Sequence, residues 1–429
     1  MLSFYLLFRW ILMSTQISFV STGQEPLSVV EQRNWGGMES LRACWSNLAA
    51  QLPGLSIFLT PEWLFSWWLA YGENKTFCVL TFSTAHEGVV GIAPLYWERR
   101  ELAPLPALRV LRFMGDGSSD SDDLDFIVKP GYAARVAQAL LEWMRRAQWD
   151  ICEFNCLSSK SEVAALLVNE VRAAGWKIET SERPLSRITF PATWEKYLKT
   201  LSAKERGKIG HRLRHLQARH PVQFRRCTRS DELPEFLNTL YALHQKRWES
   251  RGEPGSFALP ARRRFYLEMT RELLGRGWLE LWQLEMDGTP VASQIGMRYG
   301  SRVYALQEGF DPAYATDSVG YVLRSQILRN CIDSGARSYD FLYGDQESKL
   351  RWGAEIGHYI DLRFSRKHGY GAIYLTGNHL WRGTKTWLRT HLPANALKML
   401  QKLRSRMQRR RPQFADAVAS PTETGTETR

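Results

Sequence analysis

Apolar and polar positions alternate along the chain in a way that predicts strands and helices in a recurring order. A helix is expected over residues 60–71, because Thr60 suits an N-cap and Pro61 suits the first helical position. The elements expected after it are strands at 76–82, 89–97, 108–114 and 124–128, a helix at 132–146, a strand at 150–157 and a helix at 161–174.

The second part of the chain has a similar order. The expected elements are helices at 194–201 and 204–219, a strand at 222–227, helices at 231–250 and 260–275, strands at 279–286, 290–299 and 302–309, a helix at 318–334, a strand at 338–343, a short helix from 346 and a strand at 359–364. Each part contains a strand, an acidic loop, a helix, a strand with Asp and another helix. We interpret this as a duplication with its boundary at 186–193.

The order predicts an α/β (α+β) protein with two similar halves, each a mixed, mostly antiparallel sheet flanked by helices. The 429 residues are sufficient for two hydrophobic cores. The expected organisation is an N-terminal extension (1–40), a first half (41–188), a second half (189–370) and a basic amphipathic tail (371–429). The extension begins with a short apolar run, too short to span a bilayer, which we interpret as a non-native extension or an upstream start, with Met13 as the candidate true start.

The formal charge of +13 indicates an anionic partner. One basic cluster lies in the expected helix 204–219, where it favours a phosphate-bearing substrate or a solvated face. A second cluster covers 381–412. Apolar residues recur there at helical spacing: Ala396, Leu400, Leu403 and Met407. Such a tail suits an anionic membrane surface, and a solvated tail is the alternative.

Other patterns mainly exclude functions. Six scattered cysteines without a CxxC pair are typical of reduced thiols in a cytoplasmic protein. The loop 116–125 contains five Asp residues but lacks EF-hand spacing, so no calcium site is expected. No HExxH, P-loop, GxSxG or zinc-ligand spacing occurs in the sequence. Metal catalysis, nucleotide hydrolysis and Ser-triad chemistry are therefore disfavoured.

Several short motifs together resemble one known family. They are Thr60-Pro61-Glu62-Trp63, Leu243-His244-x-x-Arg247-Trp248, Asp287-Gly288-x-Pro290-Val291-Ala292, Gly309-Phe310-Asp311-Pro312, and Asp340-Phe341-Leu342-x-Gly344 with Lys349-x-x-Trp352. The pattern, over roughly residues 55–365, resembles the acyltransferase domain of CelD-type cellulose and exopolysaccharide biosynthesis proteins. These are proteins of the GNAT superfamily, related to the FemAB aminoacyl transferases.

The resemblance implies tandem GNAT-like halves and an acyl-CoA co-substrate such as acetyl-CoA, without a metal. We expect an N- or O-acyltransferase acting on a small-molecule, saccharide or peptide acceptor in polysaccharide or cell-envelope biosynthesis. The alternatives are a FemAB-like transferase that uses aminoacyl-tRNA, and an inactive scaffold that assists a membrane polysaccharide synthase. The expected location is cytoplasmic or peripheral at the inner face of the membrane, and no DNA partner is expected.

The resemblance places the donor where the strand 302–309 leads into the helix 318–334. The residues expected to hold acyl-CoA are Gln307, Gly309, Ser318, Val319, Gly320 and Tyr321. Free N–H groups at a helix start bind phosphate, and a helix cap at Thr316 or Asp317 is expected. A single Gly in this window also fits an ordinary capped helix.

Asp340 lies in an apolar strand, where it can be a general base or a structural carboxylate; Glu308 is the alternative base. His244, Arg247 and Trp248 fall on one helix face and are expected to line the acceptor pocket, unless they are ordinary packing and solvated residues. Lys349, followed by Arg351, is expected to neutralise a substrate phosphate, or to be solvated. The first half is expected to be degenerate or to shape the acceptor cleft.

Overall fold

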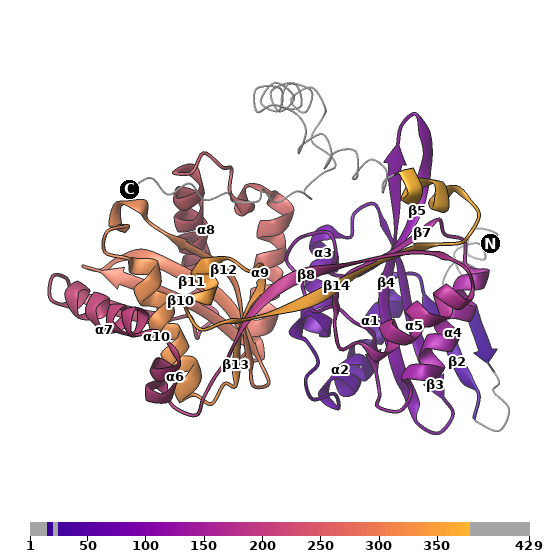
Figure 1. Cartoon of the computed structure of the whole chain (residues 1–429), viewed down its shortest axis with the longest axis horizontal. Helices are drawn as coiled ribbons and strands as arrows, with labels where there is room; N and C mark the ends of the chain where they lie inside the picture. Colours follow the sequence, from indigo (N-terminus) through magenta and orange to yellow (C-terminus); the bar gives the residue numbers. More distant parts are fainter. Residues whose placement is uncertain (1–14, 20–24, 378–429) are drawn as a thin grey trace, which may run out of the picture.

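The computed structural model describes residues 15–19 and 25–377, which form two lobes joined by one continuous sheet (Figure 1). The sheet has 14 strands, and its order is β1-β2-β3-β4-β5-β7-β14-β8-β13-β12-β11-β10-β9, with β6 paired to β4. Neighbouring strands are antiparallel except for two pairs, β5 with β7 and β12 with β13. Each lobe therefore contains one parallel pair in an otherwise antiparallel arrangement.

The first half contains strands and helices that alternate along the chain. Its strands are β1 (Thr15–Phe19), β2 (Leu27–Gln32), β3 (Lys75–Thr84), β4 (Gly88–Leu102), β5 (Leu105–Phe113), β6 (Ile127–Val128), β7 (Ile151–Ser158) and β8 (Lys177–Thr189). Its helices are α1 (Trp35–Ser40), α2 (Arg42–Ala50), η2 (Ile57–Leu59), α3 (Pro61–Tyr71), α4 (Ala133–Arg146) and α5 (Glu162–Ala173).

The second half repeats the series after two additional helices, α6 (Trp194–Thr200) and α7 (Ala203–Gln217). Its strands are β9 (Val222–Arg226), β10 (Leu279–Met286), β11 (Thr289–Tyr299), β12 (Arg302–Phe310), β13 (Ser338–Tyr343) and β14 (Glu355–Ser365). Its further helices are α8 (Leu233–Glu249), η3 (Ser256–Ala258), α9 (Pro260–Gly275), η4 (Pro312–Tyr314), α10 (Val319–Asp333) and α11 (Glu347–Leu350). The predicted fold class, with two similar halves, is confirmed.

The two halves exchange their last strands. β8, from the first half, pairs with β13, whereas β14, from the second half, pairs with β7. β8 and β14 also pair with each other from Glu355↔Arg187 to Ser365↔Lys177, and they run side by side through the middle of the molecule (Figure 1). Each half-sheet is therefore completed by a strand of the other half.

Equivalent bulges in β7 and β13 support the duplication. In each strand two residues lie opposite a single residue of the exchanged strand, which is the definition of a bulge. The second residue of each bulge, Cys156 or Leu342, has a positive φ of 53° or 61°. Non-glycine residues rarely adopt this conformation, so its repetition at matching positions indicates a shared origin for the two strands.

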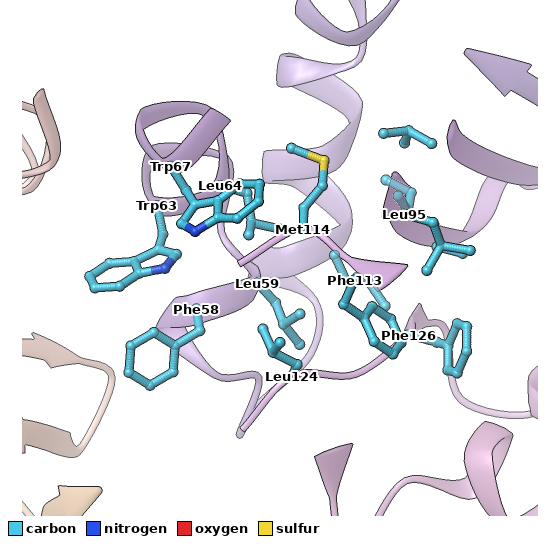
Figure 2. Close-up of a cluster of buried hydrophobic side chains, with 14 of the residues drawn as sticks. Phe58, Leu59, Trp63, Leu64, Trp67, Leu95, Phe113, Met114, Leu124 and Phe126 are labelled. Atoms are coloured by element: carbon cyan, nitrogen blue, oxygen red, sulfur yellow. The ribbon is translucent and has the colours of Figure 1, made fainter. Parts of the chain in front are cut away.

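Aromatic residues fill the core of the first half and reach the second. Thr60 caps α3, and Trp63 and Trp67 of that helix pack in the cluster shown in Figure 2. The indole N–H of Trp63 donates to the Ser121 hydroxyl, so this large side chain is buried with its polar atom satisfied. Trp63 also makes an edge contact with Phe265 of α9, at a centroid distance of 5.0 Å.

The structure differs from the sequence-based expectations in three segments. Residues 27–32, assigned to the N-terminal extension, form β2 and pair with β3. The segment 177–189, for which no element was expected, forms β8. Only residues 127–128 of the expected strand 124–128 are a strand, because the preceding residues belong to a loop. The N-terminal run at 4–13 and the basic tail from residue 378 onwards lie outside the described residues, and among the described helices none is long and apolar enough to cross a membrane.

Candidate functional site

The candidate site lies where the parallel strands β12 and β13 separate. Their ladder covers only Arg302–Tyr304 with Ser338–Asp340, although β12 continues to Phe310. A bulge in the β11–β12 ladder falls at Leu306, between the pairs Ile295↔Gln307 and Gly296↔Ala305. The extra residue of a bulge is left out of the ladder, so backbone groups are available beside the gap between the strands.

A chain of polar side chains crosses this gap between helices on opposite faces of the sheet. Glu308 of β12 pairs with Arg247 of α8 at 3.0 Å and also with Arg324 of α10. The Nε atoms of both arginines are buried and have no hydrogen-bond partner among the described residues. Buried guanidinium groups with an unused donor are suited to an anionic group of a ligand.

The two arginines make Glu308 a poor proton acceptor. Burial acts to raise the pKa of Glu308, but Arg324 and Arg247 outweigh it, so the pKa lies below its usual value. A carboxylate that is held ionised in this way takes up a proton less readily. The geometry therefore favours a positioning role for Glu308 rather than the predicted role as alternative base.

Asp340 is fully buried, and both of its oxygens are occupied. Oδ1 accepts the N–H of Leu342, the bulge residue of β13, and Oδ2 pairs with Arg187 of β8 at 2.6 Å. Burial raises the pKa of Asp340, while Arg187 opposes this effect. The carboxylate thus fixes the bulge and the exchanged strand, which corresponds to the structural interpretation of this residue.

His244 and Trp248 form a fixed pair on α8. The Trp248 indole N–H donates to Nε2 of His244 at 2.9 Å, which requires the neutral imidazole to carry its proton on Nδ1. Burial, with the nearby Arg247, lowers the pKa of His244 to about 4. His244 is completely buried, and its contact with Trp248 fixes the position of that indole on α8.

Lys349 closes the end of β13. Its ammonium donates to the carbonyl oxygens of Phe341, at 3.1 Å, and Tyr343. Burial lowers the pKa of Lys349 to about 8, although Asp122 and Asp340 act to raise it. A partly buried lysine that titrates near neutral pH can bind an anion or exchange a proton beside the gap.

The first half also contributes to this region, through its acidic loop. Asp122 accepts the N–H of Tyr343 at 2.9 Å, and Asp123 pairs with Arg302 at 2.8 Å. Burial raises the pKa of Asp122 to about 6. The acidic loop that could not be assigned a calcium site therefore holds β12 and β13 in place.

The start of α10 is only partly as predicted. The helix is capped by Ser318, which has a φ of 57° and makes no side-chain cap bond, so the expected cap at Thr316 or Asp317 is wrong. The N–H groups of Ser318 and Tyr321 donate to backbone carbonyls, whereas those of Val319 and Gly320 have no acceptor among the described residues. Two of the four predicted donors therefore remain available for a phosphate.

Packing explains the two glycines assigned to the donor site. A Cβ on Gly309 would lie 2.3 Å from the backbone nitrogen of His244, so this glycine permits close approach of α8 to β12. A Cβ on Gly320 would lie 3.5 Å from the Phe310 ring, which is an ordinary contact. Packing therefore accounts for Gly309, whereas Gly320 has room for a Cβ and retains its free N–H group.

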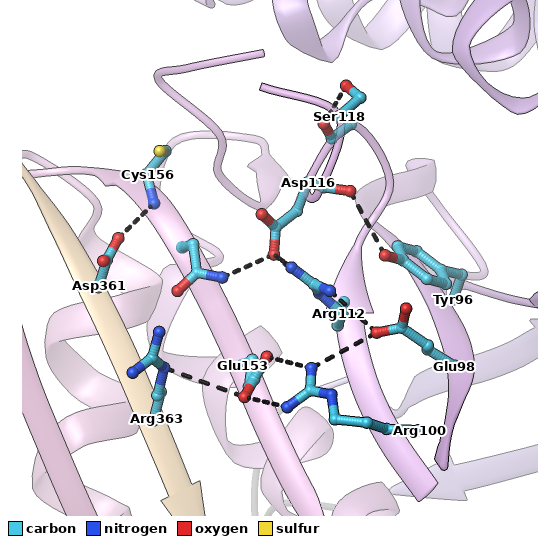
Figure 3. A network of polar contacts seen from close by, with 12 residues as sticks. Tyr96, Glu98, Arg100, Arg112, Asp116, Ser118, Glu153, Cys156, Asp361 and Arg363 are labelled. Atoms are coloured by element: carbon cyan, nitrogen blue, oxygen red, sulfur yellow. Dashed lines mark hydrogen bonds and ion pairs between the residues drawn. The ribbon is translucent and has the colours of Figure 1, made fainter. Parts of the chain in front are cut away.

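The corresponding gap in the first half is filled by the chain itself. Asp116, directly after β5, accepts hydrogen bonds from Arg112 and from Asn155 of β7 and so closes the gap (Figure 3). Further along, Leu124 forms an isolated bridge to β7, donating to the Cys156 carbonyl and accepting from the Ser158 N–H, both at 2.9 Å. Leu124 thus occupies the backbone N–H and carbonyl groups of β7 that a ligand would otherwise contact at this gap.

One family model matches part of this chain. Residues 203–350 match a family model described as an acetyltransferase (GNAT) domain. This match covers most of the second half, and it supports the assignment of the protein as an acyltransferase. No curated protein matches the sequence significantly.

Solved structures show the same fold at low sequence identity. FemX is similar with a TM-score of 0.56 and 12% identity, over 78% of this chain and 98% of that chain. A conserved protein of unknown function from Bacteroides thetaiotaomicron VPI-5482 has a TM-score of 0.51 and 14% identity, over 76% and 97%. A tandem GNAT protein from the clavulanic acid biosynthesis pathway has a TM-score of 0.42 and 12% identity, over 80% and 99%.

Sequence reasoning missed the residues that connect the predicted ones. Arg324 shares Glu308 with Arg247, Arg187 neutralises Asp340, and Tyr339 accepts from Gln294 at 2.7 Å within the core below the site. Arg324 could have been found, because it follows Gly320 by one helical turn on the face that meets β12. Arg187 could not, because its strand was not predicted.

Proposed function

We propose that the protein transfers an acyl group from acyl-CoA to an amine or hydroxyl group of an acceptor at the gap between β12 and β13. One observation carries this proposal: among the described residues no strand segment bridges the gap within the region matched by the GNAT model, whereas Leu124 bridges to β7 at the equivalent gap of the first half. The donor's acyl arm would lie beside the separated strands, with backbone groups near the Leu306 bulge directed at the thioester carbonyl.

The chemistry proposed is direct transfer. The acceptor nucleophile attacks the thioester carbonyl, the carbon–sulfur bond breaks, and the proton that the acceptor loses passes to the departing CoA thiolate, which leaves as the thiol. Backbone N–H groups stabilise the developing oxyanion, and the positioning of both substrates supplies much of the acceleration. The pyrophosphate of the donor would meet the free N–H groups of Val319 and Gly320.

The acceptor would approach from the face covered by α8. Arg247 of α8 has an unused Nε donor below this face, and Trp248 offers an aromatic surface on which a sugar ring can stack. This combination favours an acceptor with a saccharide and an anionic group. It agrees with the resemblance to CelD-type proteins, and on that basis we propose a role in polysaccharide or cell-envelope biosynthesis, cytoplasmic or at the inner face of the membrane.

A matched pair of substitutions at Gly320 tests the donor site. Gly320→Pro removes one free N–H in the first helical turn, where no intrahelical hydrogen bond is lost. Gly320→Ala keeps the N–H and adds only an ordinary contact with Phe310. Loss of a charge-assisted hydrogen bond of about 1.5–3 kcal/mol should weaken acetyl-CoA binding by roughly 10- to 100-fold in the Pro variant alone.

Calorimetric titration with acetyl-CoA and longer acyl-CoAs is the measurement, with melting temperatures as a check on folding. Equal affinities of the wild type and Gly320→Pro would place the donor elsewhere. If the wild type binds no acyl-CoA, the proposed donor is wrong.

A second candidate is transfer from aminoacyl-tRNA. The fold likeness to FemX and the basic helix α7 favour it. Binding of tRNA would weaken steeply with salt, because several phosphates would be neutralised by Lys and Arg. A filter-binding series with tRNA from 50 to 200 mM salt would separate the two donors. Binding of neither donor would instead favour the inactive scaffold beside a polysaccharide synthase.

A further inference from the structure

A pocket in the first half lies beside the C-terminal end of α4, in the other lobe from the gap between β12 and β13 (Figure 1). Its volume is about 360 Å³, a size that admits one sugar ring with its substituents. The sheet and the helix both contribute to its lining, which is formed mainly by Glu31, Arg33, Trp97, Arg109, Trp143 and Arg146. None of these residues belongs to the candidate acyl-transfer site.

Two indoles form the floor of the pocket. Trp97 of β4 and Trp143 of α4 lie nearly parallel, with ring centroids 5.9 Å apart and an interplanar angle of 28°. Both side chains are buried, and the N–H of Trp143 donates to Glu31 at 3.3 Å. The floor is therefore aromatic and held in place, which suits the C–H face of a sugar ring.

The rim of the pocket carries an excess of positive charge. Glu31 is buried, and its carboxylate is held by a bidentate pair with Arg33, in which both distances are 3.0 Å. Arg109 and Arg146 are exposed. The guanidinium of Arg109 lies over the Trp97 ring at 4.5 Å and makes no ion pair with the described residues. With three arginines against one glutamate, the lining attracts an anion.

A like-charged pair of arginines lies at the same edge. Arg99 of β4 is directly opposite Arg109 of β5 in their ladder, and like charges in opposite positions destabilise a sheet. Glu101 pairs with Arg99 at 2.9 Å, but both side chains are largely exposed, so the pair contributes little. The two arginines therefore lower stability, and binding of an anion would offset this effect.

The end of α4 does not oppose an anion. The last carbonyl groups of a helix carry partial negative charge, which would repel an anionic ligand. Here the guanidinium of Arg366 donates to three of these carbonyl oxygens at distances between 2.7 and 3.2 Å, those of Met144, Arg145 and Ala147. The negative end of the helix is thus neutralised from within the protein.

We propose that this pocket binds a sugar ring that carries an anionic group. The ring would lie against the two indoles, and its carboxylate or phosphate would pair with Arg109 and Arg146. A uronic acid unit of an acidic polysaccharide and a sugar phosphate both supply this chemistry. The choice of a sugar rests on the proposed function, in which the acceptor contains a saccharide. A polysaccharide held here would stay attached to the first half while another of its units reaches the transfer site.

Two substitutions on separate elements test the pocket. Arg109→Gln and Arg146→Gln each remove one charge from the rim, and melting temperatures show whether the variants fold. Arg172→Gln on α5 is the matched control, because Arg172 is exposed in the same half and does not line the pocket. The probes are a tetramer of galacturonic acid, its neutral methyl ester and galactose 1-phosphate, titrated calorimetrically at low salt so that ion pairs are not screened.

We expect each rim substitution to weaken binding of the acidic tetramer about tenfold, with the control equal to the wild type. The neutral ester should bind the wild type more weakly than the acid does, and acetyl-CoA binding should be unchanged in all variants. Tighter binding of galactose 1-phosphate than of the tetramer would support the pocket with a sugar phosphate as its ligand.

The remaining outcomes separate this inference from the proposed function. Equal binding of the tetramer by the wild type and both rim variants would overturn the site. If the wild type binds acetyl-CoA but neither acidic sugar, the pocket assignment is wrong while the donor stands. If the wild type binds the tetramer in a manner that depends on Arg109 but binds no acyl-CoA, the pocket assignment is retained and the proposed donor is wrong.

Discussion

In each half, two parallel strands separate after a short ladder and leave a gap. The two gaps differ in whether another segment of the described chain lies in them. Between β5 and β7 the gap is closed by Asp116 and Leu124. Figure 3 shows Asp116 and the buried ion pairs around it. Between β12 and β13 the gap contains no inserted strand segment in the described structure, and polar side chains from both faces meet there. The first half thus has internal contacts at the position where we propose that the second half binds its donor.

The acidic loop of the first half contacts both gaps. The acidic loop that fills the first gap also extends to the second half, where Asp122 and Asp123 hold β13 and β12. Asp120 of the same loop pairs with Arg262 of α9 at 2.7 Å. The acidic loop of the first half thus supports the strands that border the gap of the second half.

The largest effect is expected from removing the carboxylate that closes the first gap. Asp116→Ala leaves Arg112 buried with less compensation, and breaking a buried pair of this kind costs about 3–5 kcal/mol. Denaturant unfolding measures this loss, and Asp345→Ala, an exposed position, should stay within about 0.5 kcal/mol of the wild type. A stable Asp116→Ala variant that binds acyl-CoA at a second site would show that the first gap is not degenerate.

An intermediate effect is expected at the two equivalent bulges. Asp340 accepts the Leu342 N–H and pairs with Arg187, and Asp361 accepts the Cys156 N–H at 3.0 Å and pairs with Arg183 at 2.5 Å. Asp340→Asn and Asp361→Asn should each lower stability by about 1.5–3 kcal/mol, because each weakens a hydrogen bond to a charged group.

Melting temperature and turnover together separate the two roles of Asp340. Similar losses of stability in both variants, with acyl-CoA affinity retained, would agree with a structural role. A loss of turnover in Asp340→Asn at unchanged melting temperature would instead identify Asp340 as the base.

The smallest effect concerns pH. Lys349 has a pKa of about 8, so its positive charge is largely present at pH 7 and largely absent at pH 9. If that charge contacts the donor, acetyl-CoA binding should weaken by up to roughly tenfold over this range. Lys349→Arg should remove the dependence, because Arg stays charged. Calorimetric titration at both pH values checks this, and an unchanged slope in Lys349→Arg would exclude the contact.

The titration of Lys349 also affects the free energy of unfolding. Raising the pH weakens the expected binding of acetyl-CoA, but it increases the contribution of Lys349 to stability. The folded-state pKa lies below the unfolded value of 10.5, so the unfolded chain binds more protons between pH 8 and pH 10.5. The contribution of this group to stability therefore rises as pH increases through that window.

Patterns within a few residues of sequence predicted the helices and strands that carry the candidate site. The cap and first turn of α3, the strands β10 to β12 and the face of α8 all follow from spacing within a few residues. Glu308 and Arg247 were both selected, and the structure pairs them. The motif at Asp340 was also found, and the buried contacts of this carboxylate favour the structural one of its two predicted roles.

Long-range arrangement accounts for what was missed. β8 has charged residues along most of its length and lies between two other strands, so neither alternation nor a continuous apolar run marks it. Without β8, the partner of Asp340 could not be identified. The cap of α10 was wrong because Ser318 adopts a left-handed conformation, which its sequence neighbours do not indicate.

The exchange of β8 and β14 also determines the order in which the strands can pair while the chain is being synthesised. β7 emerges from the ribosome with one edge unpaired, and its partner β14 begins only at Glu355. Until then the first half exposes a strand edge that can pair with another chain. Such distant pairing is slow to form, so the growing chain depends on rapid completion or on a chaperone that covers this edge.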